Sequence, residues 1–285
     1  MTNKIILVAE SGADIPEEYK KQYGIQIVPM YVEMNGKSFP DCSFPVREIY
    51  KYYEETGKSP KTSAPNSEDY RMVFTEIHQE FPEASILHLG YSAVTSCSYQ
   101  NSLIASEEMD FVYHIDSKAV SAGQGALLIR TARFIEKNSH MPIEVIMEHI
   151  QEWINCQCMC FLPNTVEYLK AGGRVSNAAY LGATLLSIKP LIEIIDGKLV
   201  STRKYRGNAG KTIPRMIDDF FKNNNPERQE IYVLWAEGFD HSQDEMIEKQ
   251  LKGYGVDQII WGQTGTVITT HGGPGVFGLA GYKRF

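Results

Sequence analysis

The sequence predicts an α/β protein of two domains, with an N-terminal parallel sheet flanked by helices and a C-terminal α+β domain. Through the first half of the chain, short apolar runs alternate with longer amphipathic segments, which is typical of the strands and helices of a parallel sheet. Beyond about residue 155 the pattern changes, and two short apolar runs flank the turn pair Asp196-Gly197 as in a β-hairpin. We therefore expect domains of residues 1–154 and 155–285.

In the N-terminal half, four apolar runs have the length of buried strands, at residues 4–8, 25–31, 85–89 and 111–115. Helices are expected between these strands. One begins near Asp14, with Pro16 in its first turn, and another begins at Ser67, after which apolar residues recur at helical spacing. Two further helices are expected at residues 98–108 and 123–137.

The C-terminal half mixes hairpin strands with helices. The hairpin strands are expected at residues 192–195 and 198–201, on either side of the turn. Further strands are expected at 231–235 and 266–270, and helices at 208–222 and 242–252. Antiparallel strands that are mixed with helices indicate an α+β domain.

The 285 residues carry a formal charge of −7, with 43% hydrophobic and 22% charged residues. These are ordinary values for a folded protein and argue against wholesale disorder. The acidic balance argues against a nucleic-acid partner, because phosphate binding needs a basic face. Lys4 is followed by only a short apolar run, and the uncharged stretch at 258–282 is interrupted by Gly and Pro. We therefore expect no signal peptide and no membrane span, and we predict a cytoplasmic protein.

Three of the five cysteines, Cys156, Cys158 and Cys160, alternate along a predicted strand and would share one of its faces. Thiolate metal sites usually need a second group of ligands, and the remaining cysteines, Cys42 and Cys97, are isolated. We interpret the three as small buried residues and expect neither a disulfide framework nor a metal site.

Two segments rich in hydroxyl groups each precede a predicted helix. The first contains Thr62 and Ser63, and the second is the segment at residues 90–98, which contains Ser96. Hydroxyls beside the unpaired N–H groups of a helix N-terminus can bind a small anion, although each segment alone is also compatible with a simple helix cap. Loops at the carboxyl ends of parallel strands converge, so we expect the two segments to meet.

Two glycine-rich segments add a cation and a histidine. Arg174 follows paired glycines in residues 170–176, and His271 leads the sequence His-Gly-Gly-Pro-Gly directly after the predicted Thr-rich strand. Arg174 could equally be a surface residue behind a helix stop. The glycines after His271 exceed what a turn needs and indicate a positioned histidine. Together with the hydroxyl groups, these side chains suit a carboxylate or a phosphate.

A serine hydrolase of acyl esters is the alternative. Ser92 lies between a strand and a helix, as in a nucleophile elbow, and the order Ser92, Asp116, His271 matches α/β-hydrolases. Ser96 is the other candidate nucleophile for His271. Val94 replaces the closing glycine of the elbow, which disfavours this interpretation. Phosphate-loop, dinucleotide-binding and zinc-helix motifs are missing from the sequence.

Seven motifs follow one another along nearly the whole chain. They are Glu-Ser-Gly-Ala-Asp at residues 10–14, Thr-Ser-x-Pro at 62–65, the loop at 92–100, Ile-Asp-Ser-Lys at 115–118, Glu-Tyr-Leu-Lys-x-Gly-Gly-Arg at 167–174, Ile-Lys-Pro at 188–190 and His-Gly-Gly-Pro-Gly at 271–275. This ordered set resembles the DegV family of bacterial fatty-acid-binding proteins. The chain departs from the family pattern at three positions, where Glu10 replaces an aspartate, Ala93 a serine and Cys97 a glycine.

The resemblance implies a two-domain DegV-like protein that holds one long-chain fatty acid in a deep tunnel between its domains. It assigns the carboxylate-binding hydroxyls to Thr62 and Ser96, in loops of the N-terminal domain, and the C-terminal domain would close the tunnel. Four further residues are expected near the carboxylate: Ser63, Cys97, Arg174 and His271. No catalytic residue, metal or cofactor besides the bound fatty acid is implied. The implied partner is a fatty-acid kinase, which makes acyl-phosphate from the carboxylate that this protein presents.

Six basic residues and no acidic residue lie between Asp196 and Asp218: Lys198, Arg203, Lys204, Arg206, Lys211 and Arg215. This segment is compatible with a solvated face. It is also compatible with docking to an acidic kinase surface, or transiently to an anionic membrane surface where fatty acid is collected. The C-terminal part as a whole is also the more basic one, since residues 1–154 have a net charge of −9 and residues 155–285 one of +2.

Overall fold

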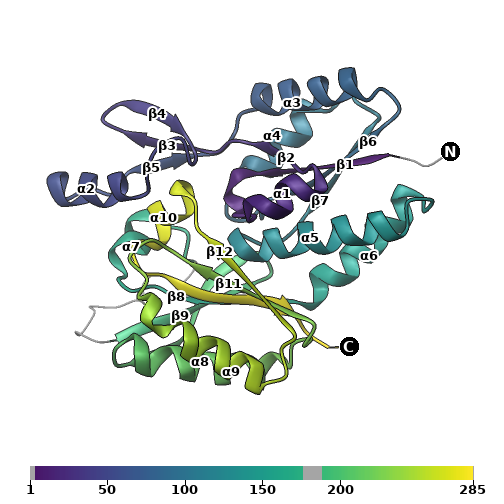
Figure 1. The fold of residues 1–285 in the computed structure, drawn as a ribbon. Coiled ribbons are helices and arrows are strands. Elements are labelled where there is room, and N and C mark those ends of the chain that lie inside the picture. Colours follow the sequence, from purple (N-terminus) through teal and green to yellow (C-terminus); the bar gives the residue numbers. More distant parts are fainter. Residues whose placement is uncertain (1–3, 176–187, 285) are drawn as a thin grey trace.

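The computed structural model describes residues 4–175 and 188–284. Its N-terminal part contains a four-stranded parallel sheet in the order β2-β1-β6-β7, made of Ile5–Glu10 (β1), Gln26–Val28 (β2), Ser85–Gly90 (β6) and Val112–Asp116 (β7). Helices around this sheet include Glu17–Tyr23 (α1), Ser67–Glu80 (α3) and Ser98–Ala105 (α4) (Figure 1). The predicted parallel sheet with flanking helices is confirmed, with element bounds shifted by a few residues.

Helix α3 shows how local sequence produces these elements. The Asn66 side chain accepts a hydrogen bond from the backbone N–H of Asp69 (3.0 Å), and the Asp69 carboxylate accepts one from Asn66 N (2.8 Å). This reciprocal capping box satisfies N–H groups that would otherwise lack partners at the start of the helix. The side chains of Tyr70 and Phe74, one turn apart, are then completely buried against the parallel sheet.

A small antiparallel sheet in the order β4-β3-β5 consists of Tyr31–Met34 (β3), Lys37–Pro40 (β4) and Lys61–Ser63 (β5), with helix Arg47–Thr56 (α2) between β4 and β5 in the chain. The prediction of a single strand at residues 25–31 is wrong. Pro29, which cannot donate a ladder hydrogen bond, separates β2 from β3. The Asn35-Gly36 turn between β3 and β4 has positive φ at both residues, as type I′ hairpins require, and this signal was not among the predicted elements.

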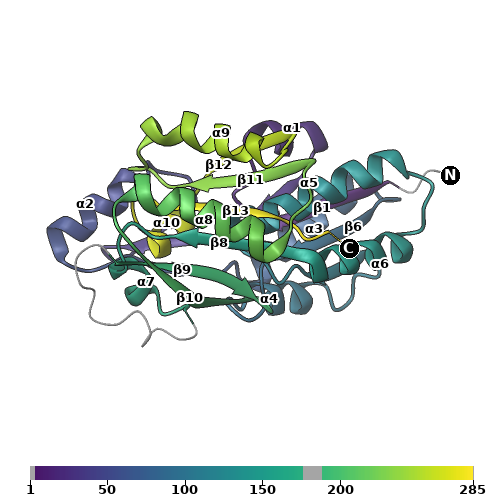
Figure 2. The same ribbon diagram turned by 90° about the horizontal axis from the view of Figure 1, so that it is seen from below.

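The C-terminal part is a six-stranded mixed sheet in the order β10-β9-β8-β13-β11-β12. Its strands are Gln157–Leu162 (β8), Ile188–Ile195 (β9), Lys198–Arg206 (β10), Glu230–Trp235 (β11), Gln258–Gln263 (β12) and Phe277–Tyr282 (β13). Helices Ala209–Asn224 (α8) and Asp244–Gly253 (α9) cover its outer face (Figure 2). The predicted C-terminal α+β domain is confirmed, and so is the antiparallel hairpin around Asp196-Gly197.

The strand predicted at residues 266–270 is wrong, because this segment forms helix α10 (Thr266–Gly272). Its Val and Thr residues are β-branched and favour strands by local propensity. A distant residue overrides this preference: Asp41 Oδ1 accepts hydrogen bonds from Val267 N (3.0 Å) and Thr266 Oγ1 (2.7 Å), which caps the first turn. His271 therefore lies near the end of a helix and not in a loop after a strand.

Helix α5 (Ser121–Lys137) lies between the two large sheets and contacts both (Figure 1). Residues 121–129 are all buried, so this segment has no solvent-facing side. One core cluster joins Leu7 of β1, Leu128 of α5 and Leu234 of β11, so the two parts of the chain share a hydrophobic core. Helix α6 (Ile143–Cys156) then leads into β8, and the expected boundary at residues 154 and 155 falls in the last turn of α6.

Cys158 and Cys160 lie on one face of β8 and are buried in the C-terminal core. Cys156 is the last residue of α6, so the prediction that all three cysteines share a strand face is wrong. Burial raises the pKa of Cys158 to about 12, which keeps this thiol neutral. Within residues 4–175 and 188–284, no group of three or more His, Cys, Asp or Glu residues could hold a metal ion, and no helix has the length and apolar character needed to cross a membrane.

We expect alanine to have opposite effects at two helical glycines. At Gly125 in α5, a Cβ would lie 2.7 Å from the backbone oxygen of Ala13, so Gly125→Ala should lower the free energy of unfolding by about 1–3 kcal/mol. At Gly253 in α9, a Cβ would meet no atom within 4 Å, so Gly253→Ala should raise it by up to about 1 kcal/mol. Urea unfolding measures both changes. Equal effects at the two positions would contradict the close packing of α5 against residues 11–13.

Candidate functional site

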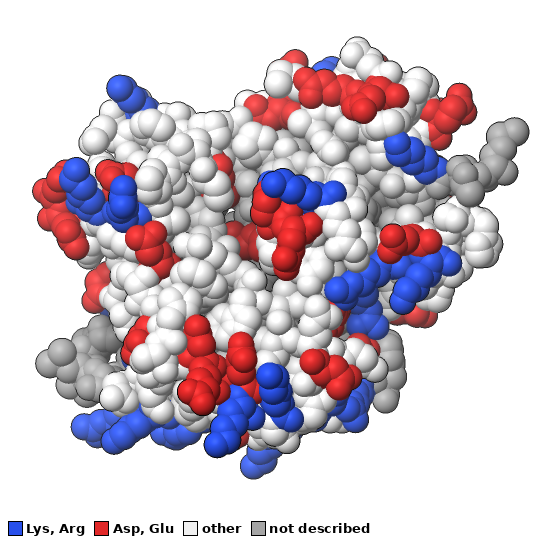
Figure 3. Space-filling model, in the orientation of Figure 1, with Lys and Arg blue, Asp and Glu red and all other residues white. Residues whose placement is uncertain are grey.

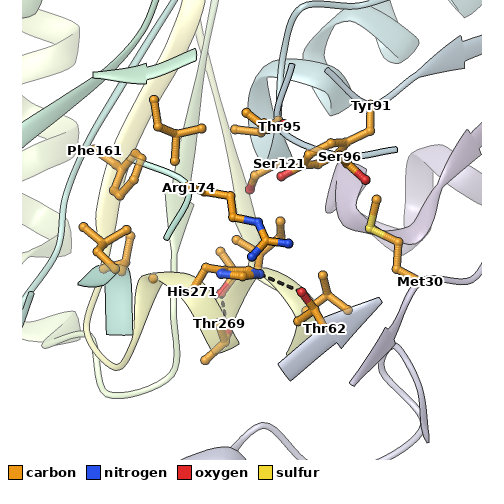
Figure 4. Close-up of a pocket in the computed structure, with 18 of the residues that line it drawn as sticks. Met30, Thr62, Tyr91, Thr95, Ser96, Ser121, Phe161, Arg174, Thr269 and His271 are labelled. Atoms are coloured by element: carbon orange, nitrogen blue, oxygen red, sulfur yellow. Dashed lines mark hydrogen bonds between the residues drawn. The ribbon is translucent and has the colours of Figure 1, made fainter. Parts of the chain in front are cut away.

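A cavity of about 400 Å³ is lined by residues from both parts of the chain (Figure 4). Its walls are largely apolar, with Met30 and Val120 on the N-terminal side and Phe161, Leu199 and Leu234 on the C-terminal sheet. The volume lies in the usual range for small-molecule sites. All six residues predicted at or near the carboxylate line this one cavity: Thr62, Ser63, Ser96, Cys97, Arg174 and His271.

Thr62 and His271 form a hydrogen-bonded pair on one side of the cavity. Thr62 lies on β5 and pairs with Val32 of β3, so the small antiparallel sheet fixes its position. Its Oγ1 is 2.8 Å from Nε2 of His271. Ser63, the last residue of β5, lines the cavity beside it. The pair therefore joins an N-terminal strand to the C-terminal helix α10.

Ser96 lies in the loop of residues 91–97 between β6 and α4. Its Oγ accepts a hydrogen bond from the backbone N–H of Ser98 (3.1 Å), in the first turn of α4. Among the described residues its hydroxyl donates to none, so its proton is available to a ligand in the cavity. Cys97, at the N-cap of α4, is exposed beside it. Figure 4 shows Ser96 across the cavity from Thr62 and His271.

His271 is held as a neutral imidazole. Burial, and to a smaller extent the positive charge of Arg174, lower its pKa to about 4. Its Nδ1 is buried and has no hydrogen-bond partner among the described residues. This side of the ring packs against Gly172, at the end of helix α7 (Glu167–Gly172), where a Cβ would overlap with Nδ1. The absence of a side chain at position 172 therefore makes room for the histidine.

Arg174 lies at the exposed edge of the cavity. Helix α7 ends at Gly172, and Gly173 has a φ of 64°, the left-handed conformation that favours glycine. Arg174 follows this helix stop, and its Nη1 donates to the backbone oxygen of Gly172 (2.6 Å). Figure 4 shows its guanidinium next to the His271 ring and directed into the cavity. The segment is thus a helix stop that also presents a cation to the site.

The arrangement does not support a serine-hydrolase triad within the described residues. Ser92 is fully buried, and its Oγ donates to the backbone oxygen of Gly197 (2.8 Å). Asp116 Oδ1 accepts a backbone hydrogen bond from the same loop (3.2 Å) and contacts no histidine. Ser96 shares the cavity with His271, but no carboxylate contacts Nδ1 of that ring. Nucleophilic serine catalysis needs a base that is itself oriented by a third group, and this is missing here.

Tyr91, Thr95 and Met30 are among the cavity residues that were not predicted from the sequence. Tyr91 and Thr95 belong to the same loop as Ser96, and their place directly after a buried strand was a signal for the site. Met30 carries no comparable signal, because it reaches the cavity only through the interruption between strands β2 and β3 at Pro29. Its position depends on the turn between β2 and β3.

Comparisons of sequence identify one family. A family model described as “Uncharacterised protein, DegV family” matches residues 4–284. A Thermotoga maritima protein named “Fatty acid-binding protein” is 30% identical over 282 residues, which cover 97% of this chain and 96% of that protein. A DegV domain-containing protein of Caldanaerobacter subterraneus is also 30% identical, over 284 residues that cover 97% of this chain and 98% of the relative.

Solved structures share the complete fold. A structure described as fatty acid binding of a DegV family protein from Thermus thermophilus has a TM-score of 0.88 at 26% identity, covering 99% of this chain and 100% of that one. A DegV lipid binding protein from Thermotoga maritima has a TM-score of 0.85 at 28% identity, with the same coverage. Because the match extends over nearly the full length in both sequence and fold, the chain belongs to the DegV family.

Proposed function

We propose that this protein binds one long-chain fatty acid, with the acyl chain in the apolar cavity and the carboxylate between Thr62 and Ser96. The observation that carries the proposal is that hydroxyl groups from two separate segments line one largely apolar cavity. The names of the related proteins, which describe fatty-acid and lipid binding, support the same ligand class.

The apolar walls supply the affinity in this proposal. Each methylene group removed from water contributes about 0.8 kcal/mol, so a long acyl chain gains more from burial than from its head group. The polar groups instead determine at which end of the cavity the carboxylate lies. Neutral hydroxyls can hold the carboxylate without placing an unpaired cation among apolar side chains.

His271 would orient the hydroxyl of Thr62. Because the ring is neutral, Nε2 either donates to Thr62 Oγ1 or accepts from it across the 2.8 Å contact. If Nε2 carries the proton, the Thr62 hydroxyl proton is left for a carboxylate oxygen, and we assign this tautomer to the ligand-bound protein. Ser96 would donate to the other oxygen, since its Oγ already accepts from Ser98 N.

We propose that the protein is a cytoplasmic carrier without catalytic activity of its own, which presents the carboxylate to a separate fatty-acid kinase. Arg174 and Cys97 are exposed while they line the cavity, so the carboxylate end is the end nearer to solvent. A head group held there by two neutral hydroxyls can be approached by a phosphoryl donor on another protein. In this proposal residues 1–154 supply the hydroxyl loops, and residues 155–285 close the cavity.

The proposed docking site is a basic surface on the C-terminal part. Within the basic segment, Arg203 forms an ion pair with Asp219, and the guanidinium of Arg215 lies 5.4 Å from the centre of the Tyr205 ring, so both side chains have partners on the protein. All six basic residues of the segment are exposed, including Lys198, Lys204, Arg206 and Lys211. Figure 3 shows Lys and Arg atoms gathered along the lower edge, where the C-terminal part lies. This surface fits an acidic kinase face, or transiently an anionic membrane surface.

Native mass spectrometry of the purified protein tests the ligand. We expect one intact fatty acid per chain. The variant Thr62→Ala/Ser96→Ala should bind the same fatty acid at least about 100-fold more weakly, because hydrogen bonds to a charged group contribute about 1.5–3 kcal/mol each. Ser38→Ala/Thr202→Ala removes two exposed hydroxyls and should bind like the wild type. A protein that carries no acyl chain, or an unchanged affinity in the first variant, would contradict the proposal.

The protonation state of His271 can be followed by NMR of its ring as the pH is lowered. We expect the neutral form from pH 8 to about pH 5 and proton uptake near pH 4, because burial and Arg174 both disfavour the charged ring. Arg174→Ala should raise this pKa only in part, since burial, the larger cause, remains. Lys249→Ala, an exposed cation on α9, serves as the control. A wild-type titration near the ordinary value of 6.5 would show that the ring is not held neutral.

Charge reversal tests the basic surface. Arg206→Glu/Lys211→Glu should weaken acyl-phosphate formation with the kinase, or transfer of fatty acid from anionic vesicles, without changing the affinity for fatty acid in solution. Lys222→Glu/Lys249→Glu, on helices α8 and α9, is the matched control for net charge. If the first variant behaves like the control in both assays, the surface is only a solvated face.

A further inference from the structure

Glu10 is a buried carboxylate behind the loop that carries Ser96. It ends β1, and its side chain is 0% exposed. Five donors from five segments surround its two oxygens: Tyr70 Oη (2.6 Å), His88 Nε2 (3.2 Å), Tyr91 N (2.8 Å), Ser98 Oγ (2.7 Å) and Gln124 Nε2 (2.9 Å). Although desolvation raises the pKa of Glu10, these contacts, with His88 first among them, lower it to about 2. Glu10 is therefore a charged residue in the protein interior.

This carboxylate holds both ends of the loop of residues 91–97. Glu10 Oε2 accepts from Tyr91 N where the loop begins, and Oε1 accepts from Ser98 Oγ directly after the loop ends. Ser98 N in turn donates to Ser96 Oγ (3.1 Å). The direction of the Ser96 hydroxyl thus depends on Ser98, and Glu10 fixes the position of Ser98.

His88 and His114 continue the hydrogen-bond network behind Glu10. His88 Nε2 donates to Glu10 Oε1 (3.2 Å), and His88 Nδ1 lies 3.0 Å from His114 Nδ1. His114 is neutral, because burial above all lowers its pKa to about 3. Two hydroxyl groups of the α4 region contact the His114 ring: Ser102 Oγ is 3.3 Å from Nδ1, and Ser106 Oγ is 2.8 Å from Nε2.

The contact between Glu10 Oε1 and His88 Nε2 joins two fully buried side chains. A buried carboxylate that loses a hydrogen-bond donor is destabilised, so Glu10 cannot move away from His88 without a cost in free energy. Gln124 restrains the other carboxylate oxygen, because its Nε2 also donates to the backbone oxygen of Leu89 (2.8 Å), one residue before the end of β6. The carboxylate is thus fixed relative to the strand from which the loop starts.

We propose that Glu10 is a positioning residue for the ligand carboxylate. It lies outside the set of residues that line the cavity, and it acts by holding both ends of the 91–97 loop so that the Ser96 hydroxyl faces Thr62. This inference rests on the proposed function, because it needs Ser96 to contact the fatty acid. It adds a buried carboxylate and its donors to the groups on which ligand binding depends.

A double-mutant cycle separates positioning from general stability. Glu10→Gln should weaken fatty-acid binding about 10-fold or more, because an amide NH₂ group would replace one of the acceptor oxygens that hold the loop ends. In the Ser96→Ala background the same change should alter the affinity less than about threefold, since the hydroxyl that it positions is gone. In the Thr62→Ala background the full effect should remain, because β5 and not Glu10 holds Thr62.

Further variants control for loss of stability. Tyr205→Phe removes the hydrogen bond from a buried tyrosine to Asp219 in the C-terminal part, and it should leave the affinity unchanged. Glu10→Asp keeps the charge beside His88 and should recover part of the affinity that Glu10→Gln loses. If Glu10→Gln does not fold, Ser98→Ala takes its place in the cycle. It removes the link between Oγ and Glu10, together with the contact of Oγ to Tyr70 Oη (2.6 Å), and it keeps the backbone N–H that donates to Ser96.

An unchanged affinity in Glu10→Gln, or equal effects in the wild-type and Ser96→Ala backgrounds, overturns this inference and leaves fatty-acid binding intact. Failure of the proposed function has a different result: the wild type binds no fatty acid, or Ser96→Ala has no effect. In that case, amide hydrogen exchange of residues 92–97 in the ligand-free chain tests whether Glu10 anchors the loop. Faster exchange in Glu10→Gln but not in Tyr205→Phe supports the anchor, and unchanged exchange overturns it.

Discussion

The arrangement of the molecule depends on the burial of helix α5 between the two large sheets. Because residues 121–129 have no solvent-facing side, the parallel sheet and the mixed sheet cannot separate without exposing this helix to water. Gly125 allows the helix to approach the backbone at Ala13 closely, so α5 lies tightly against the segment that follows β1. The segments that carry Thr62 and Ser96 are thereby held against those that carry Arg174 and His271. A shared core, and not direct pairing between the sheets, creates the cavity.

Within the site, the charges and the neutral polar groups have separate places. His271 is neutral, and Thr62 and Ser96 are uncharged at any physiological pH, so these three polar groups bring no net charge to the apolar cavity. The cation, Arg174, lies at the exposed edge, where water screens it. An anion can then be attracted to the opening without being bound so strongly that it cannot be passed on. In the proposed function, this separation suits a carrier better than an enzyme that must stabilise a developing charge.

The elements whose signals are local were predicted from the sequence. The prediction failed where contacts between residues far apart in the chain determine the structure. Thr62 and Ser96 line one cavity as predicted, but only Ser96 follows a parallel strand, since Thr62 lies on the antiparallel strand β5. Arg174 and His271 were indicated by the glycine-rich segments around them. The prediction of a strand at residues 266–270 was wrong because the cap of helix α10 comes from Asp41, over two hundred residues away. The role of Glu10 could not be seen either, because a single acidic residue at the end of an apolar run gives no indication of the five donors that surround it in the fold.

The buried pair of Glu10 and His88 is better explained by loop position than by stability. Removing a carboxylate from water is costly even when donors surround it, so apolar side chains of similar size would suffice for the fold alone. An apolar side chain at position 10, however, would leave Tyr91 N and Ser98 Oγ without their acceptor. Glutamine offers one acceptor oxygen in place of two, and these donors contact different oxygens. Only a carboxylate meets both loop ends, and in this interior it needs the donors that surround it, His88 Nε2 among them. The buried carboxylate and its donors are therefore a consequence of fixing the loop at both ends.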